Sequence, residues 1–329
     1  MQVESRDFEV LDKGRGILAG LAIGDAFGRP VEGLTREAIR ELYGNVNNFL
    51  TTKPAGSDDT EYAVLTASVL IEHGLDSTSE DFANYWISNV CSQSGAFAGA
   101  GFSEMLAIEN LRRGLRPPES GKHIHSWSDG LAMRVAPIAI ASRGDLETAK
   151  RLTIADGEVS HSGEGIYSGI VAAVAATATL QEISAIEVFT AAQNSIPKES
   201  WTYRALQDVW LAFKNRRDEN LSAFADELLE IIPTHHYVFA DFGPEATALA
   251  LGSVLAGAGD FVETIRFAVN LGRDADTIAA IAGSIAGGLA GFTAIPTDWK
   301  LALTPLEGSC LEFTKGVQPM DLVESLVNL

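Results

Sequence analysis

The segment 274–292 constrains the fold of this 329-residue chain more than any other part of its sequence. It is rich in glycine and alanine, and four large apolar residues recur in it at helical spacing: Ile278, Ile281, Ile285 and Leu289. Gly283, Gly287 and Gly288 lower its helix propensity but allow a neighbouring helix to approach closely. The pattern predicts a buried helix that packs tightly against other helices.

Similar patterns occupy much of the remaining chain. The helix predicted around 63–70 has apolar residues on several faces, and 161–180 and 245–258 are rich in small apolar residues. Alternating strand patterns of useful length are almost absent, and prolines fall mainly between the predicted helices. A length of 329 residues is compatible with two domains or with one large helical domain. Because no repeat or linker divides the chain, we expect a single all-α domain over 1–329.

Charge and composition exclude several classes of protein. Asp and Glu number 44 against 24 Lys and Arg, a net charge of −20, and no basic run is present. We therefore expect no nucleic-acid partner and no binding to an anionic membrane. The N-terminus lacks the pattern of a signal peptide, and the apolar stretch 278–292 is too short to span a bilayer comfortably. Two cysteines, Cys91 and Cys310, suggest a reducing compartment. These features predict a cytoplasmic protein.

Two short acidic loops are unusually polar for their surroundings, and each precedes an apolar helix. The first, 56–60, reads GSDDT, and the second, 272–277, reads GRDADT. One interpretation is helix capping, in which Asp58 pairs with Glu61 in a capping box and Asp274 caps the other helix. Capping explains one carboxylate in each loop. It does not explain the second carboxylate beside it, because like charges close together repel unless something neutralises them.

The other interpretation is a shared metal site. Hard divalent cations such as Mg²⁺ prefer oxygen ligands from carboxylates, hydroxyls and water. The two loops supply six such side chains: Ser57, Asp58, Asp59, Asp274, Asp276 and Thr277. Four carboxylates with few imidazoles favour Mg²⁺ or Mn²⁺ over Zn²⁺, and two cations balance them better than one. Such a site would join segments more than two hundred residues apart.

These loops belong to a longer series of motifs. In chain order the sequence reads GILAGLAIGDAFGRPVEG, GSDDT, SDGLAMRVAPIAI and GRDADTIAAIAGSIAGGLAG. Between about Gly14 and Leu301 it resembles the ADP-ribosylglycohydrolase family, which includes the nitrogenase-reactivating glycohydrolase and the ADP-ribosyl-acceptor hydrolases. The resemblance implies an orthogonal multi-helix bundle with a binuclear magnesium centre at the bottom of a cleft. It also implies cleavage of an N- or O-glycosidic bond at the anomeric carbon of an ADP-ribosyl group.

The resemblance assigns the six loop residues named above to two metal motifs, although Ser57 stands where many members have Thr. Glu32 matches a glutamate that in some members approaches the metals and gates the substrate. The candidate catalytic residues are therefore Asp58, Asp59 and Glu32. Asp58 or Asp59 is the candidate to orient a bound water and accept its proton.

The loop before the MRVAP motif matches a glycine-rich loop that holds phosphate or ribose in the family. Its residues, with one histidine that resembles a cleft-lining residue, are the candidate substrate-binding set: Ser126, Trp127, Ser128, Asp129, Gly130 and His161. Trp127 could stack on a base or ribose, or be buried beside Pro137. Many members have Asn-Gly where this chain has Asp129-Gly130, and arginine-directed members often have an acidic residue in place of Ser126. A carboxylate at 129 would repel a diphosphate but could accept hydrogen bonds from ribose hydroxyls.

Three hypotheses about function follow. The first is a magnesium-dependent hydrolase that cleaves the glycosidic bond of an ADP-ribosyl adduct on a protein or small acceptor. The second is a metal-dependent N-glycosidase of a small nucleoside or ADP-ribose derivative, which Asp129 favours. The third is a non-enzymatic binding or structural protein, against which the intact metal motifs argue.

Overall fold

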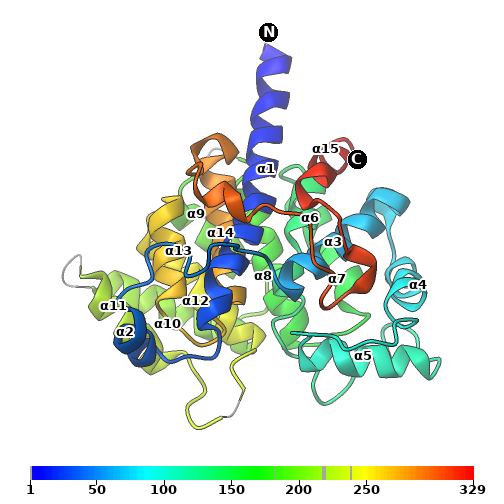
Figure 1. Cartoon of the computed structure of the whole chain (residues 1–329), viewed down its shortest axis with the longest axis horizontal. Coiled ribbons are helices and arrows are strands. Elements are labelled where there is room, and N and C mark those ends of the chain that lie inside the picture. Colours follow the sequence, from blue (N-terminus) through cyan, green and yellow to red (C-terminus); the bar gives the residue numbers. More distant parts are fainter. Residues whose placement is uncertain (1, 182, 217–219, 238) are drawn as a thin grey trace.

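A computed structural model describes residues 2–181, 183–216, 220–237 and 239–329, with side chains from Phe8 onward (Figure 1). Within these ranges the regular secondary structure is helical, and the strand-like pairings are two isolated bridges, Thr35 with Gly272 and Ser128 with Phe242. None of the described helices combines the length and apolar character needed to cross a lipid bilayer. The prediction of an all-α fold is confirmed.

The described part of the chain contains fifteen α-helices: α1 (Gln2–Gly28), α2 (Arg36–Tyr43), α3 (Asp58–His73), α4 (Ser79–Asn89), α5 (Phe102–Arg112), α6 (Ala136–Ala141), α7 (Leu146–Gly157), α8 (Glu164–Ala178), α9 (Ala185–Gln193), α10 (Trp201–Asn215), α11 (Leu221–Ile231), α12 (Gly243–Ala256), α13 (Phe261–Val269), α14 (Ala275–Ala290) and α15 (Val323–Val327). Short 3₁₀ helices lie between them: η1 (Arg29–Val31), η2 (Gly74–Asp76), η3 (Ala132–Arg134), η4 (Phe292–Ala294), η5 (Trp299–Ala302), η6 (Glu312–Thr314) and η7 (Pro319–Leu322).

The central helix pair, α1 and α14, comes from opposite ends of the chain (Figure 1). Small residues face one another along it. A Cβ on any of four α1 glycines would collide with a carbonyl oxygen of α14, in the pairs Gly16–Gly287, Gly20–Gly283, Gly24–Ala279 and Gly28–Ala275. Because glycine has no Cβ, the two backbones can lie in direct contact. The apolar stripe on α14 is buried at Ile278, Ile281 and Ile285, as the sequence predicts.

The other helices surround this pair and help to position the N-terminal ends of α3 and α14. α12 and α13 pack against α14, while α3 and α6 pack against α1. The last turns of α1 lie beside the first turn of α14, and Asp25 on α1 is hydrogen-bonded to the start of α3. The N-terminal ends of α3 and α14 therefore meet at one end of the central pair.

Candidate metal and substrate site

A cavity of about 280 Å³ lies where these helix ends meet. Its acidic lining residues come from five places in the sequence: Glu32, Asp58, Asp59, Asp129, Asp241, Asp274 and Asp276. Thr277 and Arg273 also line it, together with the small residues of the 99–101 loop. The fold thus brings Glu32 and both acidic loops to one cavity.

The densest group of carboxylates lies between the loop after η1 and the start of α14. Ligand atoms of Glu32, Asp274 and Asp276 all lie within 4.8 Å of one another. Across from them, the Thr277 hydroxyl donates a hydrogen bond to Asp59 Oδ1 at 3.3 Å. The hydroxyls and carboxylates of the two loops are therefore adjacent, which is the arrangement that a shared cation site requires.

Asp25 holds the start of α3 in place. Its buried carboxylate accepts hydrogen bonds from the backbone N–H of Ser57 at 2.7 Å and of Thr60 at 3.2 Å, and from the Thr60 hydroxyl at 2.5 Å. These bonds satisfy backbone donors at the helix start that would otherwise lack partners. The turn that carries Asp58 and Asp59 is thus fixed to α1 rather than to its own side chains.

The structure contradicts the capping interpretation of the acidic loops. Ser57, not Asp58, occupies the N-cap position of α3, and its side chain makes no capping hydrogen bond. Glu61 points elsewhere, because its carboxylate accepts hydrogen bonds from the backbone N–H groups of Ser309, Cys310 and Leu311. Asp274 is the N-cap residue of α14, but its side chain makes no capping bond either. The carboxylates of both loops are therefore available to the cavity.

Burial raises the pKa of four aspartate carboxyl groups of the two acidic loops. The pKa of Asp58 rises to about 8, first through burial and then through the neighbouring Asp25 carboxylate. Burial also raises the pKa values of Asp59, Asp274 and Asp276 well above the usual range, and neighbouring carboxylates add to each shift.

Little positive charge within the protein offsets this cluster. Among the described residues that line the cavity, Arg273 is the only positively charged one. Its Nε donates a 2.6 Å hydrogen bond to the buried carboxylate of Glu245, while its buried Nη2 has no hydrogen-bond partner. The cavity therefore carries a large excess of acidic groups.

Several polar atoms of the cluster have no hydrogen-bond partner. Ser57 Oγ, Asp59 Oδ2 and Asp276 Oδ1 are buried in this condition, although buried polar atoms are normally paired. Oxygen atoms of this kind, at adjacent carboxylates and a hydroxyl, match the ligands of hard divalent cations. The residues present fit Mg²⁺ or Mn²⁺.

Glycines next to the carboxylates leave room for them. Gly99 has a φ of +88°, a conformation that favours glycine, and a Cβ there would collide with the Asp58 carboxylate. A Cβ on Gly130 would collide with the carboxylate of Glu104. Larger residues at either position would displace an acidic side chain.

The predicted substrate loop forms one wall of the cavity, but only part of it lines the space. Asp129 and Gly130 line the cavity, whereas Ser126, Trp127 and Ser128 do not. The loop is tied to 241–243 because Asp129 N–H donates to the Asp241 carbonyl at 3.3 Å and Gly243 N–H donates to the Trp127 carbonyl at 3.2 Å.

Trp127 lies in an aromatic cluster rather than at the bottom of the cavity. It is half-buried, and its ring centroid is 4.9 Å from that of Phe242 and 5.3 Å from that of Phe102. Phe239, which is exposed and lines the cavity, contacts Phe102 in the same cluster. The aromatic cluster therefore extends from the substrate loop to the cavity.

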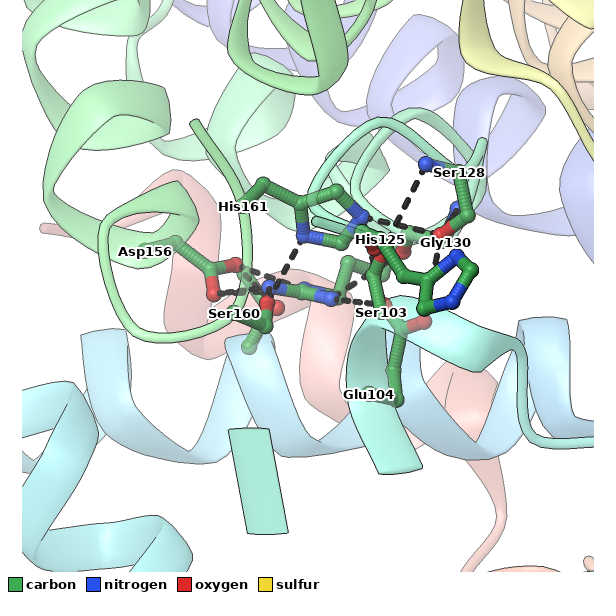
Figure 2. Close-up of polar contacts among 10 residues, drawn as sticks. Ser103, Glu104, His125, Ser128, Gly130, Asp156, Ser160 and His161 are labelled. Atoms are coloured by element: carbon green, nitrogen blue, oxygen red, sulfur yellow. Dashed lines mark hydrogen bonds and ion pairs between the residues drawn. The ribbon is translucent and has the colours of Figure 1, made fainter. Parts of the chain in front are cut away.

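His161 belongs to a buried network with Ser128 and Ser160 (Figure 2). It does not line the cavity. Its Nε2 is 3.1 Å from Ser128 Oγ, and its Nδ1 is 2.8 Å from Ser160 Oγ. Burial lowers the pKa of His161 well below its usual value, so the ring is neutral. The structure thus places His161 where it orients Ser128.

A buried ion pair completes this network. Arg134 donates to Glu104 Oε1 at 2.9 Å, to Asp156 Oδ1 at 2.9 Å and to the Gly130 carbonyl at 3.1 Å. All three charged side chains are fully buried. Arg134 therefore joins the substrate loop to α5 and α7 and holds Gly130 in position.

Some residues of the site were not predicted from the sequence. Asp25, Glu104 and Asp241 lie in or behind the cavity, and so does the Arg273–Glu245 pair. Asp25 falls within the first family-like motif and Arg134 within MRVAP, so the motifs could have identified both as candidate site residues. Asp241 has no comparable motif around it.

The four sequence motifs predicted an all-α fold in which aspartates from two distant helix starts lie together. The structure has this arrangement. A family model described as ADP-ribosylglycohydrolase matches residues 7–327, and the chain belongs to this family. A solved structure entitled "ADP-ribosylglycohydrolase-related protein complex" has the same fold. It aligns with a TM-score of 0.68 and 24% identity over 97% of this chain and 98% of that one.

Two relatives illustrate the range of the family. An uncharacterized protein of Archaeoglobus fulgidus is 33% identical, over 88% of this chain and 90% of its own length. The ADP-ribosylarginine hydrolase Tri1 of Pseudomonas putida is 27% identical, over 88% of this chain and 74% of its own. The family resemblance inferred from the motifs is confirmed.

Proposed function

We propose that this protein is a magnesium- or manganese-dependent hydrolase that cleaves a glycosidic bond at the anomeric carbon of a ribosyl group. ADP-ribosyl adducts on a protein or a small acceptor are the first substrates to test, because relatives such as the Pseudomonas putida hydrolase carry that activity in their names. Membership of the family and the acidic cavity support the proposal.

The proposed cofactors are two divalent cations held by the six loop residues, with Glu32 beside them. The observation that carries this assignment is the set of partnerless buried oxygens, Asp59 Oδ2 and Asp276 Oδ1 above all. Buried carboxylates without hydrogen-bond donors or cations are costly, and a bound cation would supply what they lack.

Cations bound there would orient ribose hydroxyls and lower the pKa of a coordinated water. Within the protein, Asp58 or Asp59 would orient that water and accept its proton at a carboxylate oxygen. Glu32 is exposed at the cavity, on the loop between η1 and α2, and would gate access to the reacting centre. Asp129 and Gly130 would contact the substrate directly, whereas Ser128 and His161 would position that loop.

Calorimetry and an activity screen test the proposal. Mg²⁺ and Mn²⁺ should bind the intact protein, and Asp276→Asn should weaken binding while the protein still folds. The screen uses ADP-ribosyl-arginine, ADP-ribosyl-serine, O-acetyl-ADP-ribose and a nucleoside panel, each with and without Mg²⁺. A folded protein that binds neither cation, or that binds them but cleaves none of these compounds, would contradict the assignment.

A further inference from the structure

A separate cavity of about 360 Å³, here called the arginine cavity, lies between α2, α11 and α13 on one side of the molecule (Figure 1). Its polar lining includes three arginines and four neutral residues: Arg36, Arg40, Arg266, Asn45, Asn47, Ser222 and Asn270. Among the described residues that line it, Glu263 is the only acidic one. None of these residues lines the acidic cavity. In a chain with a net charge of −20, this local group of positive charges is exceptional.

Arg36 supplies a guanidinium group that is fixed in place. Its side chain is only 9% exposed, and its Nη1 donates a hydrogen bond to the Asn270 carbonyl at 2.8 Å. Its Nε donates to Asp226 Oδ1 at 2.9 Å, and its Nη2 donates to the Ser222 hydroxyl at 3.3 Å. A positive charge held in this way loses little conformational freedom when a ligand binds beside it.

Arg40 lies next to Arg36 and shares its hydrogen-bond partners. Its Nη2 donates to Ser222 Oγ at 2.9 Å and to Asp226 Oδ1 at 3.4 Å. Burial lowers the pKa of Arg36, and the nearby positive charge of Arg40 lowers it further. The Nε and Nη1 atoms of Arg40 donate to no described residue. Arg40 therefore has donors available for a ligand.

Arg266 adds a third positive charge from α13. Its Nε donates to the Asn47 carbonyl at 3.2 Å and its Nη1 donates to Glu263 at 3.2 Å, whereas its Nη2 donates to no described residue. Two arginines with unused donors thus line one cavity together with a third that is buried.

We propose that the arginine cavity binds the phosphate group of a small molecule, held by Arg40 and Arg266 and supported by Arg36. Phosphate oxygens accept hydrogen bonds from several guanidinium N–H groups at once, and the planar fork of arginine matches their geometry. A volume of about 360 Å³ has room for a phosphate group and part of the molecule that carries it. Because this site is separate from the acidic cavity, the inference does not depend on the proposed hydrolysis.

Calorimetry tests the proposal with two probes, inorganic phosphate and glycerol phosphate. The protein is first treated with a chelator, because cations in the acidic cavity would bind phosphate themselves. KCl at about 150 mM screens general attraction to the protein surface. Wild-type protein should bind at least one probe, and that probe should raise its melting temperature. The probe that binds more tightly identifies the source of the phosphate group as the free ion or a phosphate monoester.

Arg40→Gln and Arg266→Gln each remove one positive charge and keep a polar side chain. Both arginine side chains are partly exposed, so these variants should fold, and either one suffices if the other does not. Each should weaken binding of the probe by at least about tenfold, because a hydrogen bond to a charged group is lost. Arg113→Gln is the matched control, since the Arg113 side chain is 76% exposed and does not line the arginine cavity.

The control should bind the probe as wild type does. An absence of binding for both probes in wild type would overturn the proposal. So would wild-type affinity in both Arg40→Gln and Arg266→Gln. An equal loss in Arg113→Gln would indicate general attraction to the protein surface and would also overturn it.

Discussion

The two ends of the α1–α14 pair differ sharply in chemistry, although the backbones are equally close at both. At one end, Gly16 and Gly20 lie against the carbonyls of Gly287 and Gly283, and their nearest neighbours are backbone atoms only. At the other, Gly28 lies against Ala275, and Asp25 and Asp276 flank the contact. The same close approach thus produces a contact between two backbones at one end and a cluster of buried carboxylates at the other.

The difference suggests that the favourable contact at the glycine end of the pair holds the unfavourable cluster of carboxylates together at the other end. Close backbone contact without side chains gives many dispersion contacts and leaves no polar group unpaired. The carboxylate end has the opposite balance, because its buried acidic groups repel one another and lack partners. We interpret the glycine end as the part of the pair that keeps the carboxylates together. Variants at the glycine end should therefore change stability, and variants at the carboxylate end should change metal binding.

The largest effect is expected at the glycine end. Gly20→Ala would place a Cβ against the backbone of Gly283, and neither backbone can move without separating the helices. We expect it to lower the free energy of unfolding by at least about 3 kcal/mol, at the upper end for overpacking. Urea denaturation measures the change. The control is Gly14→Ala on the same helix, where the nearest atoms to the Cβ would be methyl groups of Val327, Ile140 and Val323.

The control variant should remain within about 1 kcal/mol of wild type, because the gain in helix propensity offsets mild crowding. Equal stabilities for the two variants would show that the close contact with α14 does not prevent a larger side chain at position 20.

At the carboxylate end, Asp58→Asn removes one charge while keeping the size of the side chain. If Asp58 is a metal ligand, Mg²⁺ affinity and turnover should fall together by at least about 100-fold. The stability of the metal-free protein should stay equal or rise, because carboxylate repulsion is relieved. Calorimetry, turnover at saturating Mg²⁺ and melting with and without metal check these outcomes. Wild-type turnover with an unchanged metal-induced melting shift would exclude Asp58 as a ligand.

Asp25→Asn tests whether α1 positions the metal loop. Asp25 accepts three hydrogen bonds from the 57–60 turn, and Asn retains only one acceptor oxygen, so Mg²⁺ affinity should fall by roughly 10- to 100-fold. Asp12→Asn is the control at the other end of the helix, since Asp12 accepts bonds from the N–H and hydroxyl of Thr293. The control should change stability without changing Mg²⁺ affinity. Equal affinity losses in both variants would indicate a general effect on α1.

The smallest effect concerns pH in the absence of metal. The pKa of Asp58 is about 8 in the folded protein against 3.8 as its ordinary value, so the folded state binds more protons between these values. The contribution of Asp58 to stability is therefore greatest below pH 4 and is lost as the pH rises towards 8. Denaturation across this range should show a shallower decline in Asp58→Asn than in wild type. Parallel curves would contradict a raised pKa at this residue.

The sequence allowed the helices and the acidic loops to be predicted because each depends on local patterns. The 274–292 stripe became α14, and the proposed metal loops lie at the starts of α3 and α14. The loop residues line one cavity with Glu32, apart from Ser57, although their role as metal ligands stays a prediction. That residues 1–329 form a single domain also stays a prediction.

What the sequence could not reveal depends on long-range contacts. His161 was placed at the cleft by resemblance, but in the structure it lies behind the loop that it supports. Asp25 lies within the first family-like motif without a predicted role, and the packing of α1 brings it to the 57–60 turn. Asp241 reaches the cavity because 241–243 pairs with the loop at 127–129, a register that no local pattern encodes.

The pairing of α1 with α14 also determines when the protein can complete its fold. During synthesis α1 must wait for α14, since Gly16 and Gly287 are 271 positions apart. At ordinary rates of synthesis this delay is roughly 15 to 50 s. During that time the apolar face of α1 has no native partner, and contacts of such long sequence separation form slowly. We therefore expect the α1–α14 pair to form late, only after the intervening helices have been synthesised.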